Sequence, residues 1–366
     1  MISIREITDL DKLGEYREIW NKLNTEDSGG TVFTTYEWVE SWYRYYKFSG
    51  TPLVLLIYND NDPIGIVPLY VWNGTLGKIR IKRIDFAGHN LGLGNLIVTD
   101  FVDTAVPAVM DYLSAHTINW DVLILKGVFK SSAQFTGLQK WLSENKRTNE
   151  ISPYDIPAIE LKGTWDDYMN RIGKKNRYEV RKKIKKANET TAIKLHRYNS
   201  LGEQDLERYM DLLVRIGNNS WKDDSDSSIG SNAHVEGFYR QVAKQFNEKG
   251  KLDISILHIA DTPVAYLFGL LFGNKYFQID TAYLEEHKEF SPGTLLQMML
   301  VQELYDNNHN IEAIVNYGDF AYKRRYFRES VEASLFYIFS NSLRAKLAYC
   351  AKFQIIPHLQ KLHLLH

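Results

Sequence analysis

The sequence predicts an α+β protein made of two tandem lobes, each a mixed, mostly antiparallel sheet flanked by helices. Two observations predict this fold class. β-rich runs separated by turn-forming clusters alternate with stretches whose apolar residues recur at helical spacing. The order of these elements in the first half of the chain is repeated in the second half, although the two halves share little sequence identity. A chain of 366 residues, 44% of them hydrophobic, is long enough for two such lobes.

The first lobe is predicted over residues 1–161 and begins with two helical stretches near 11–24 and 35–46. Its central hairpin joins LVLLIY (53–58) to IGIVPLYV (64–71) through the turn-forming NDNDP. Strands and helices then alternate in pattern. They are strands at 79–86 and 95–98, a helix at about 105–116, a strand at 120–128, a helix at 132–145 and a strand at 153–161.

The second lobe is predicted over residues 191–340, after a connecting basic helix within 162–190. It repeats the element order of the first lobe. Its elements are a strand at 192–198, helices at 201–217 and 233–250, strands at 252–260, 264–273 and 275–284, a helix at 292–308, a strand at 311–317, a short helix at 319–327 and a strand at 331–339. Residues 341–366 form a separate basic, amphipathic helix broken by Pro357. That helix packs on its own domain, lies on a membrane surface or binds a partner.

Composition argues against several classes of protein. Forty-four basic and 45 acidic residues give a formal charge of −1, so no global field attracts nucleic acid or anionic lipid. The lone cysteine, Cys350, excludes an internal disulfide framework and a multi-cysteine metal cluster. The N-terminus lacks an apolar signal core, and no apolar run approaches the ~20 residues of a membrane span. We therefore expect a cytoplasmic protein without a metal, with 341–366 as its candidate membrane contact.

Five short motifs follow one another in the order and spacing of a known family. They are FTTYEWVESWY (33–43), GIVPLY (65–70), KKNRYEVRKKIKKA (174–187), FSPGTLL (290–296) and NYGDFAYKRRYF (316–327). With the element order, they resemble the GCN5-related N-acetyltransferase (GNAT) fold. Two copies in tandem resemble the Fem-type peptidoglycan-bridge aminoacyltransferases and the acyltransferase domain of bacterial exopolysaccharide (cellulose) biosynthesis proteins.

The motif FSPGTLL predicts an anion site at a helix N-terminus. Ser291 is a plausible N-cap, Pro292 suits the first helical position and Gly293 allows a ligand to approach the backbone. The resemblance implies that the diphosphate of acetyl-CoA or another acyl-CoA binds here, with Ser291, Gly293 and Thr294 as cofactor-binding residues. The alternative is an ordinary strand-to-helix turn. The fuller family pattern, Gln or Arg followed by two spaced glycines, is absent, and Gly293 stands alone.

The motif NYGDFAYKRRYF supplies the candidate catalytic groups. The resemblance implies that Tyr322 protonates the departing thiolate and that Lys323 stabilises the developing oxyanion. Asp319 is either the N-cap of the short helix or a group that holds the acceptor amine. The alternative for the whole run is a helix end capped by cations.

The strand at 275–284 carries polar side chains in alternation, which indicates that one of its faces lines a cleft. Asp280 is the candidate catalytic carboxylate on this strand, and Tyr283 is a candidate substrate-binding residue. Enzymes of the resembled fold also use a water chain to remove the proton, so the general base stays open.

The basic stretch 173–189 holds eight Lys or Arg residues in seventeen positions. At helical spacing, Val180 and Ala187 fall on an apolar arc, with Arg177 and Arg181 on a cationic flank beside it. The resemblance implies that these arginines bind the phosphates of a nucleotide-sugar acceptor, because a guanidinium grips phosphate in a bidentate manner. A solvated face is the alternative. A nucleic-acid interface is disfavoured, since the rest of the chain lacks further basic patches.

These features predict an N-acyltransferase that moves an acyl group from acyl-CoA to an amine of a cell-envelope or polysaccharide precursor, an amino sugar or a peptide. The second lobe is expected to be catalytic and the first a degenerate copy, because no SPG-like turn precedes the helix at 105–116. Residues 221–232 form either a lid or a plain solvated loop. An aminoacyl-tRNA-dependent ligase is one alternative, although the chain lacks the helical hairpin insertion of such enzymes. A non-catalytic subunit of a polysaccharide system is another.

Overall fold

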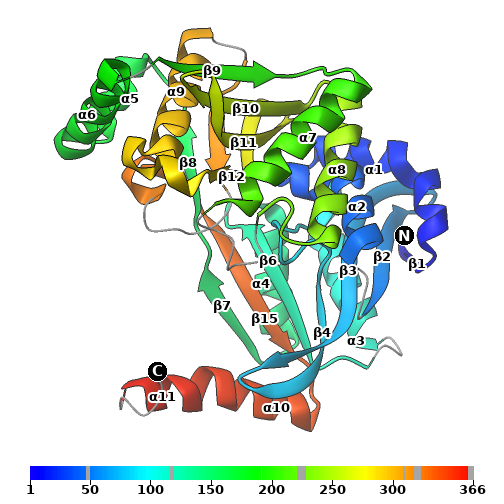
Figure 1. The fold of residues 1–366 in the computed structure, drawn as a ribbon. Coiled ribbons are helices and arrows are strands. Elements are labelled where there is room, and N and C mark those ends of the chain that lie inside the picture. Colours follow the sequence, from blue (N-terminus) through cyan, green and yellow to red (C-terminus); the bar gives the residue numbers. More distant parts are fainter. Residues whose placement is uncertain are drawn as a thin grey trace. The chain divides into compact units, whose positions relative to one another are not determined.

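The structure, a computed structural model, describes residues 1–46, 50–115, 119–190, 192–220, 228–307, 310–316 and 323–361. The chain divides into two compact units (Figure 1). Unit 1 consists of Met1–Asp155 and Glu332–His366, and unit 2 of Ile156–Val331.

Unit 1 is built on a sheet with the strand order β1-β2-β3-β4-β6-β15-β7, and β5 pairs with β3. The strands are β1 (Ile2–Ile7), β2 (Gly50–Asn59), β3 (Asp62–Leu76), β4 (Ile79–Phe86), β5 (Ile97–Val98), β6 (Val122–Phe129), β7 (Asn149–Pro153) and β15 (Ala333–Phe339). β4 and β6 run parallel, and the other pairs are antiparallel. Two-sided packing explains why β2 and β3 are continuous apolar runs and do not alternate with polar residues.

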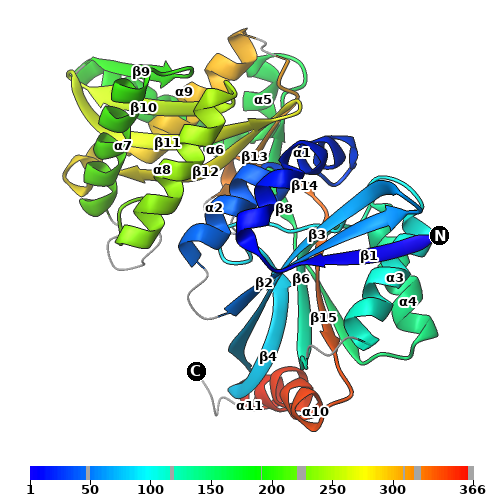
Figure 2. The same cartoon turned by 90° about the vertical axis from the view of Figure 1, so that its right-hand side faces the viewer.

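Helices cover both faces of this sheet (Figure 2). They are α1 (Arg17–Glu26), α2 (Tyr36–Tyr46), α3 (Val102–Ala115), α4 (Ala133–Glu144), α10 (Leu343–Tyr349), a π-helix (Cys350–Ile355) and α11 (Ile356–Lys361). Leu69 belongs to the core cluster shared with α3 and α4, whereas the next residue, Tyr70, packs on Trp42 of α2 with ring centroids 4.9 Å apart. Neighbouring residues of β3 therefore serve opposite layers, as the two-residue period of a strand requires.

Unit 2 is built on a sheet with the order β14-β8-β13-β12-β11-β10-β9. Its strands are β8 (Ile156–Glu160), β9 (Ile193–Tyr198), β10 (Leu252–Ile259), β11 (Thr262–Phe272), β12 (Lys275–Tyr283), β13 (Ala313–Asn316) and β14 (Glu329–Val331). Its helices are α5 (Trp165–Arg171), α6 (Lys174–Thr190), α7 (Glu203–Asn218), α8 (Ala233–Glu248) and α9 (Pro292–Asn307), with 3-10 turns η4 (Glu285–Phe290) and η5 (Lys323–Arg325). Helices α7 and α8 cover one face of the sheet and α9 the other (Figure 1).

The two units exchange strands, which the predicted lobe boundaries do not anticipate. The run 153–161 was predicted as one strand of the first lobe, but the chain bends after Pro153 and β8 pairs with β13 in unit 2. Similarly, the run 331–339 breaks at Glu332, and β15 pairs with β6 and β7 in unit 1. A hydrophobic run predicts that a strand is buried, but it does not predict which sheet the strand joins, because strand pairing is non-local.

The structure confirms the predicted fold class: two mixed, mostly antiparallel sheets flanked by helices. The helix predicted at 105–116 begins earlier, at Val102, and accommodates Pro107 in its first two turns. Within the described ranges, none of the helices combines the length and apolar character needed to cross a bilayer.

Candidate functional site

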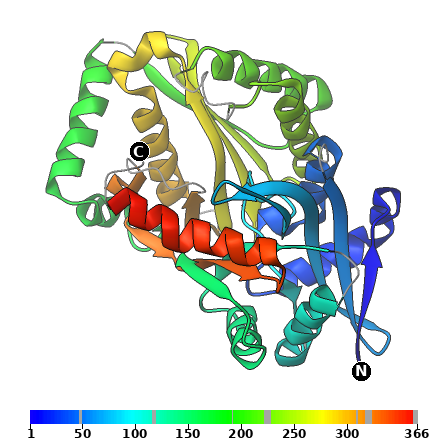
Figure 3. The same ribbon diagram turned by 90° about the horizontal axis from the view of Figure 1, so that it is seen from below.

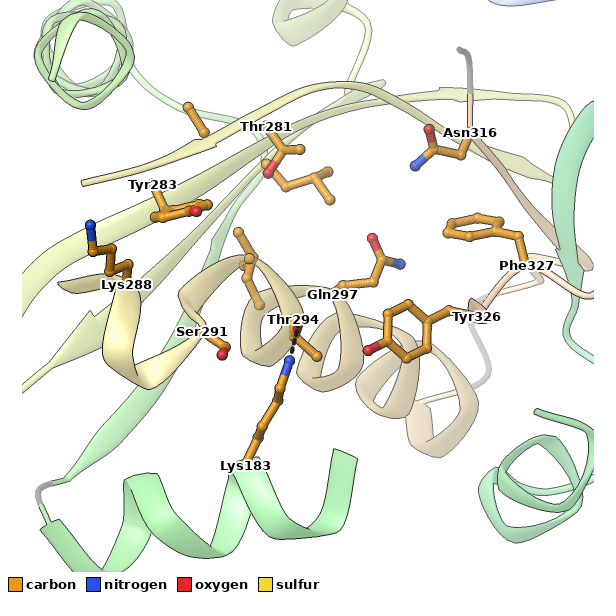
Figure 4. Close-up of a pocket in the computed structure, with 14 residues that line it drawn as sticks. Lys183, Thr281, Tyr283, Lys288, Ser291, Thr294, Gln297, Asn316, Tyr326 and Phe327 are labelled. Atoms are coloured by element: carbon orange, nitrogen blue, oxygen red, sulfur yellow. Dashed lines mark hydrogen bonds between the residues drawn. The ribbon is translucent and has the colours of Figure 1, made fainter. Parts of the chain in front are cut away.

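Strands β12 and β13 diverge in the middle of the unit 2 sheet. They pair in parallel from Lys275 opposite Ala313 to Gln278 opposite Asn316, where β13 ends. β12 continues to Tyr283, paired with β11 alone among the described strands. A β-bulge lies at the point of divergence, because Ile279 is an extra residue between two successive partners on β11. A pocket of about 320 Å³ opens beside this divergence (Figure 4).

Several segments of unit 2 line this pocket, including β11 with Leu267, η4 with Lys288 and β13 with Asn316. β12 contributes Thr281 and Tyr283, and the N-terminal turns of α9 contribute Ser291, Gly293, Thr294 and Gln297. Helix α6 contributes Lys183, and the chain after η5 contributes Tyr326 and Phe327. The three predicted cofactor-binding residues therefore line one cavity with the predicted substrate-binding residue Tyr283.

The start of α9 differs in detail from the predicted cap. Ser291 has left-handed backbone angles, φ 57° and ψ 54°, whereas an N-cap residue is normally extended. Its carbonyl, not its hydroxyl, accepts the N–H groups of Thr294 at 2.9 Å and Leu295 at 3.1 Å. Pro292 has no N–H, and the N–H of Gly293 has no acceptor in the described part of the chain. One backbone donor is thus left for a ligand.

Two cations line the pocket: Lys288, whose ammonium is paired with Glu285 at 3.0 Å, and Lys183, which lies beside the start of α9. The Lys183 ammonium donates to Thr294 Oγ1 at 3.1 Å (Figure 4). Burial lowers the pKa of Lys183, an effect that Glu179 opposes and Arg325 reinforces. A half-buried ammonium with one neutral partner retains donors for an anion. Lys183 was not predicted as a site residue, although its spacing, three residues after Val180 and four before Ala187, places it on the arc that α6 turns to the core.

Arg177 and Arg181, the predicted phosphate-binding residues, are not among the residues that line the pocket. The Arg177 guanidinium bonds instead to the side chain of Asn170, and Arg181 is exposed. The predicted amphipathic character of the helix is confirmed, because Val180 and Ala187 are fully buried.

Asp280 and Tyr283 lie on β12 but face different ways. Tyr283 lines the pocket, and burial raises the pKa of its hydroxyl, with Glu285 adding to this effect and Lys288 opposing it. Asp280 is buried away from the pocket, where its carboxylate accepts from the Tyr266 hydroxyl at 2.5 Å. Burial, together with the adjacent carboxylate, holds the pKa of Tyr266 well above its usual value. Strand alternation separates Asp280 from Thr281, which lines the pocket.

The motif at 316–327 is only partly described. Tyr322 and Asp319 lie outside the described residues, as do residues 221–227 of the predicted lid, and of Lys323 only the backbone is described. Tyr326, which the sequence analysis did not select, lines the pocket and is 8% exposed. Its carbonyl accepts from the Tyr168 hydroxyl at 3.2 Å, which anchors this segment to α5.

Side-chain amides supply further donors around the divergence. Asn316 lines the pocket and donates to Gln278 Oε1 at 2.5 Å. The Nε2 atoms of Gln278 and Gln297 are buried and find no acceptor among the residues described. Of these two residues only Gln297 lines the pocket, and because buried polar groups are normally satisfied, its amide suits a ligand that carries a carbonyl oxygen.

Unit 1 closes its corresponding gap with its own chain. The parallel pair there runs from Arg83 opposite Val122 to Asp85 opposite Ile124. Beyond it, Gly94 donates its N–H to the Lys126 carbonyl at 3.0 Å. A Cβ on Gly94 would lie 2.1 Å from the Phe86 ring, so the backbone is packed directly on that side chain.

Comparisons with known proteins identify the fold. Residues 174–324 match the family described as Acetyltransferase (GNAT) domain. The crystal structure of FemX is 11% identical with a TM-score of 0.59, and the match covers 94% of this chain and all of that chain. A protein of unknown function from Bacteroides thetaiotaomicron is 14% identical (TM-score 0.55, 93% and 100% covered). L-PGS from Bacillus licheniformis is 11% identical (TM-score 0.55, 94% and 96% covered).

A search of curated protein sequences found no match. At such low identities the three structures establish the fold alone, and they do so over more than nine-tenths of this chain. The pocket described above is lined almost entirely by residues of the matched region 174–324. The chain therefore has a tandem GNAT fold similar to the structure of FemX, and residues 174–324 of its second unit match the acetyltransferase (GNAT) domain family.

Proposed function

We propose that unit 2 transfers an acyl group from acyl-CoA to an amine of a cell-envelope or polysaccharide precursor, either an amino sugar or a peptide. The observation that carries this proposal is the convergence of Lys183, Thr294 and Gly293 on a pocket beside two diverging strands. An ammonium, a hydroxyl and a free N–H at a helix N-terminus together favour a phosphate group.

The residues present fit the diphosphate of CoA in a particular way. Lys183 Nζ and the Gly293 N–H are the donors at the start of α9, whereas the N–H groups of Thr294 and Leu295 are already bonded to Ser291. The anion would thus be held by one ammonium, one amide and the Thr294 hydroxyl, not by a row of amides. A Cβ on Gly293 would lie at an ordinary contact distance of 3.5 Å from Tyr283, so packing alone does not require glycine at this position.

The remaining pocket side chains suit the acyl and pantetheine portions of the donor. Gln297 offers its Nε2 to an amide carbonyl, and Thr281 and Phe327 lie farther along the lining. In the reaction, the acceptor nitrogen attacks the acyl carbon, the C–N bond forms and the C–S bond breaks; the nitrogen releases a proton to water and the thiolate takes up a proton. Tyr322 stays the predicted proton donor, and Tyr326 is a second candidate because it lines the pocket. Proximity of the two substrates supplies much of the acceleration.

The proposal is tested with purified full-length protein. We expect acetyl-CoA to raise the melting temperature in differential scanning fluorimetry. We also expect release of free thiol, detected with Ellman's reagent, when glucosamine or a short peptide with a free amine is added. A Tyr326→Phe variant should keep the thermal shift and lose turnover if Tyr326 is the donor. Absence of both the shift and the thiol release would exclude the CoA-dependent activity.

An aminoacyl-tRNA donor is the second candidate, favoured by the single free N–H at α9 and by the fold shared with FemX. A gel-retardation assay with charged tRNA separates the two donors. If the protein is instead a non-catalytic binding subunit, Lys183→Glu should weaken ligand binding, and Tyr326→Phe should have no kinetic effect because there is no turnover.

A further inference from the structure

The C-terminal helical segment of unit 1 presents two very different faces. α10, the π-helix and α11 follow one another without a break from Leu343 to Lys361 (Figure 3). Ala345 and Ala348 are fully buried, and they share a core cluster with Ile81 of β4 and Phe339 of β15. Phe353 packs against the same cluster. The segment is thus docked on the sheet along one side.

Its other side exposes large apolar side chains. Leu343 is 73% exposed, Leu347 51% and Ile355 54%, and these are three of the six exposed large hydrophobic residues in the described chain. In an uninterrupted α-helix, Ile355 would lie about 120° around the axis from Leu343. The wider π-helical turn at Cys350–Ile355 brings Ile355 back toward that side. The three side chains therefore form one apolar row.

Exposed cations lie on the same helical segment. Arg344, Lys346 and Lys352 are exposed, and the sequence has no Asp or Glu between residues 341 and 361. None of the three is paired with a carboxylate of the described chain. The tip of the β3–β4 hairpin adds the exposed Lys78, because the hairpin packs on the helical segment: a Cβ on Gly77 would lie only 2.7 Å from the backbone nitrogen of Lys352. A protein with a net charge of −1 thus concentrates positive charge here.

We propose that this C-terminal surface, defined as Leu343, Arg344, Lys346, Leu347, Lys352 and Ile355, docks on an anionic lipid bilayer. Cations bind the headgroups of anionic lipids, and the apolar row enters the boundary between headgroups and acyl chains. A second copy of the chain fits poorly, because a symmetric contact would set like charges against one another. Nucleic acid leaves the leucines without a role. This inference is independent of the proposed acyl transfer.

The test is flotation of the full chain with vesicles of phosphatidylglycerol and phosphatidylcholine at 3:7, compared with pure phosphatidylcholine. We expect binding to the anionic vesicles that falls at least tenfold between 50 and 500 mM salt, because surface charges are screened. Arg344→Glu/Lys346→Glu/Lys352→Glu and, separately, Leu343→Ser/Leu347→Ser should each lower the bound fraction at least tenfold.

The matched control is Lys12→Glu/Lys22→Glu/Lys140→Glu, which makes the same change in net charge at exposed positions elsewhere on unit 1. Unchanged binding of this control supports the proposal, and far-UV circular dichroism checks that every variant is folded. Equal loss in the control, equal binding to neutral vesicles, or a leucine effect confined to self-association in analytical ultracentrifugation would overturn it. The proposal would also be overturned if the triple charge variant lost RNA binding but kept vesicle binding.

Discussion

Replacing Lys183 by methionine tests the anion site most directly. Methionine keeps an unbranched side chain of similar length on α6 but removes the ammonium that lies 3.1 Å from Thr294 Oγ1. Because burial lowers the pKa of Lys183, removing its charge should not reduce the stability of the fold. Any loss of function can then be assigned to weaker binding of the ligand.

The expected loss follows from the strength of a charge-assisted hydrogen bond. Bonds to charged groups contribute about 1.5–3 kcal/mol, and every 1.4 kcal/mol is about tenfold in Kd. Lys183 is half-buried, so solvent screens part of this energy and the lower end applies. We expect the Kd for acetyl-CoA to rise by about 10–30-fold.

Isothermal titration calorimetry with two donors separates the diphosphate from the rest of the molecule. Acetyl-CoA should bind Lys183→Met more weakly than it binds the wild-type protein, whereas the thioester of pantetheine, which has no diphosphate, should bind both equally. Lys182→Met is the matched control, because Lys182 is the preceding residue of the same helix and is exposed.

Three results would refute the reasoning. Equal effects of Lys182→Met and Lys183→Met would show that only the general charge of α6 matters. An equal loss for the pantetheine thioester would place Lys183 at the acyl end. No change in the affinity of either donor would remove Lys183 from the site altogether.

Three further predictions concern stability. Gly269→Ala should lower the free energy of unfolding, measured in urea, by about 2–4 kcal/mol, because the added Cβ would lie 2.1 Å from the buried Tyr276 hydroxyl. The control Gly202→Ala should have little effect, because the space around Gly202 is open. Burial lowers the pKa of Lys126 from its usual 10.5 to about 8. Between these pH values the unfolded chain binds more protons than the folded chain, so the free energy of unfolding should rise with pH. Lys126→Met should remove that rise and stabilise the protein at pH 7 by about 1–3 kcal/mol. Burial and the neighbouring His196 lower the pKa of His258 below 6.5, so its contribution to stability is present above pH 6.5 and is lost as the pH falls below that value. In thermal melts at a series of acidic pH values, the melting temperature of His258→Gln should depend less steeply on pH than that of the wild-type protein.

Much of the fold could be predicted because its elements are locally encoded. The hairpin of β2 and β3 follows from two β-rich runs around a turn cluster, and α6 follows from an apolar arc at helical spacing. The helix start at FSPGTLL was also identified, since Pro292 at the first helical position is a local signal. The predicted residues Ser291, Gly293, Thr294 and Tyr283 do line one pocket.

The orientation of side chains explains why some predicted residues do not line this pocket and why Lys183 was not predicted. Asp280 and Thr281 are neighbours in sequence, yet only Thr281 lines the pocket, because the bulge at Ile279 and the alternation of β12 decide which side chain faces α9. On α6, Arg177 and Arg181 stay predicted ligands of the acceptor phosphates, whereas the rotation of the helix against its core selects Lys183 as the cation beside Thr294. Residue type alone could not make that choice.

The amino-acid sequence by itself determined that this protein has two lobes of one fold and that a helix N-terminus in the second lobe is suited to an anion. Periodicity and turn chemistry are local properties, and they are present in the chain before it folds. Only the tertiary structure decided that β8 and β15 cross between the sheets, that β12 and β13 diverge after Gln278, and that Lys183 completes the site. These features depend on contacts between distant segments, whose pairing is selected by packing and not by local preference.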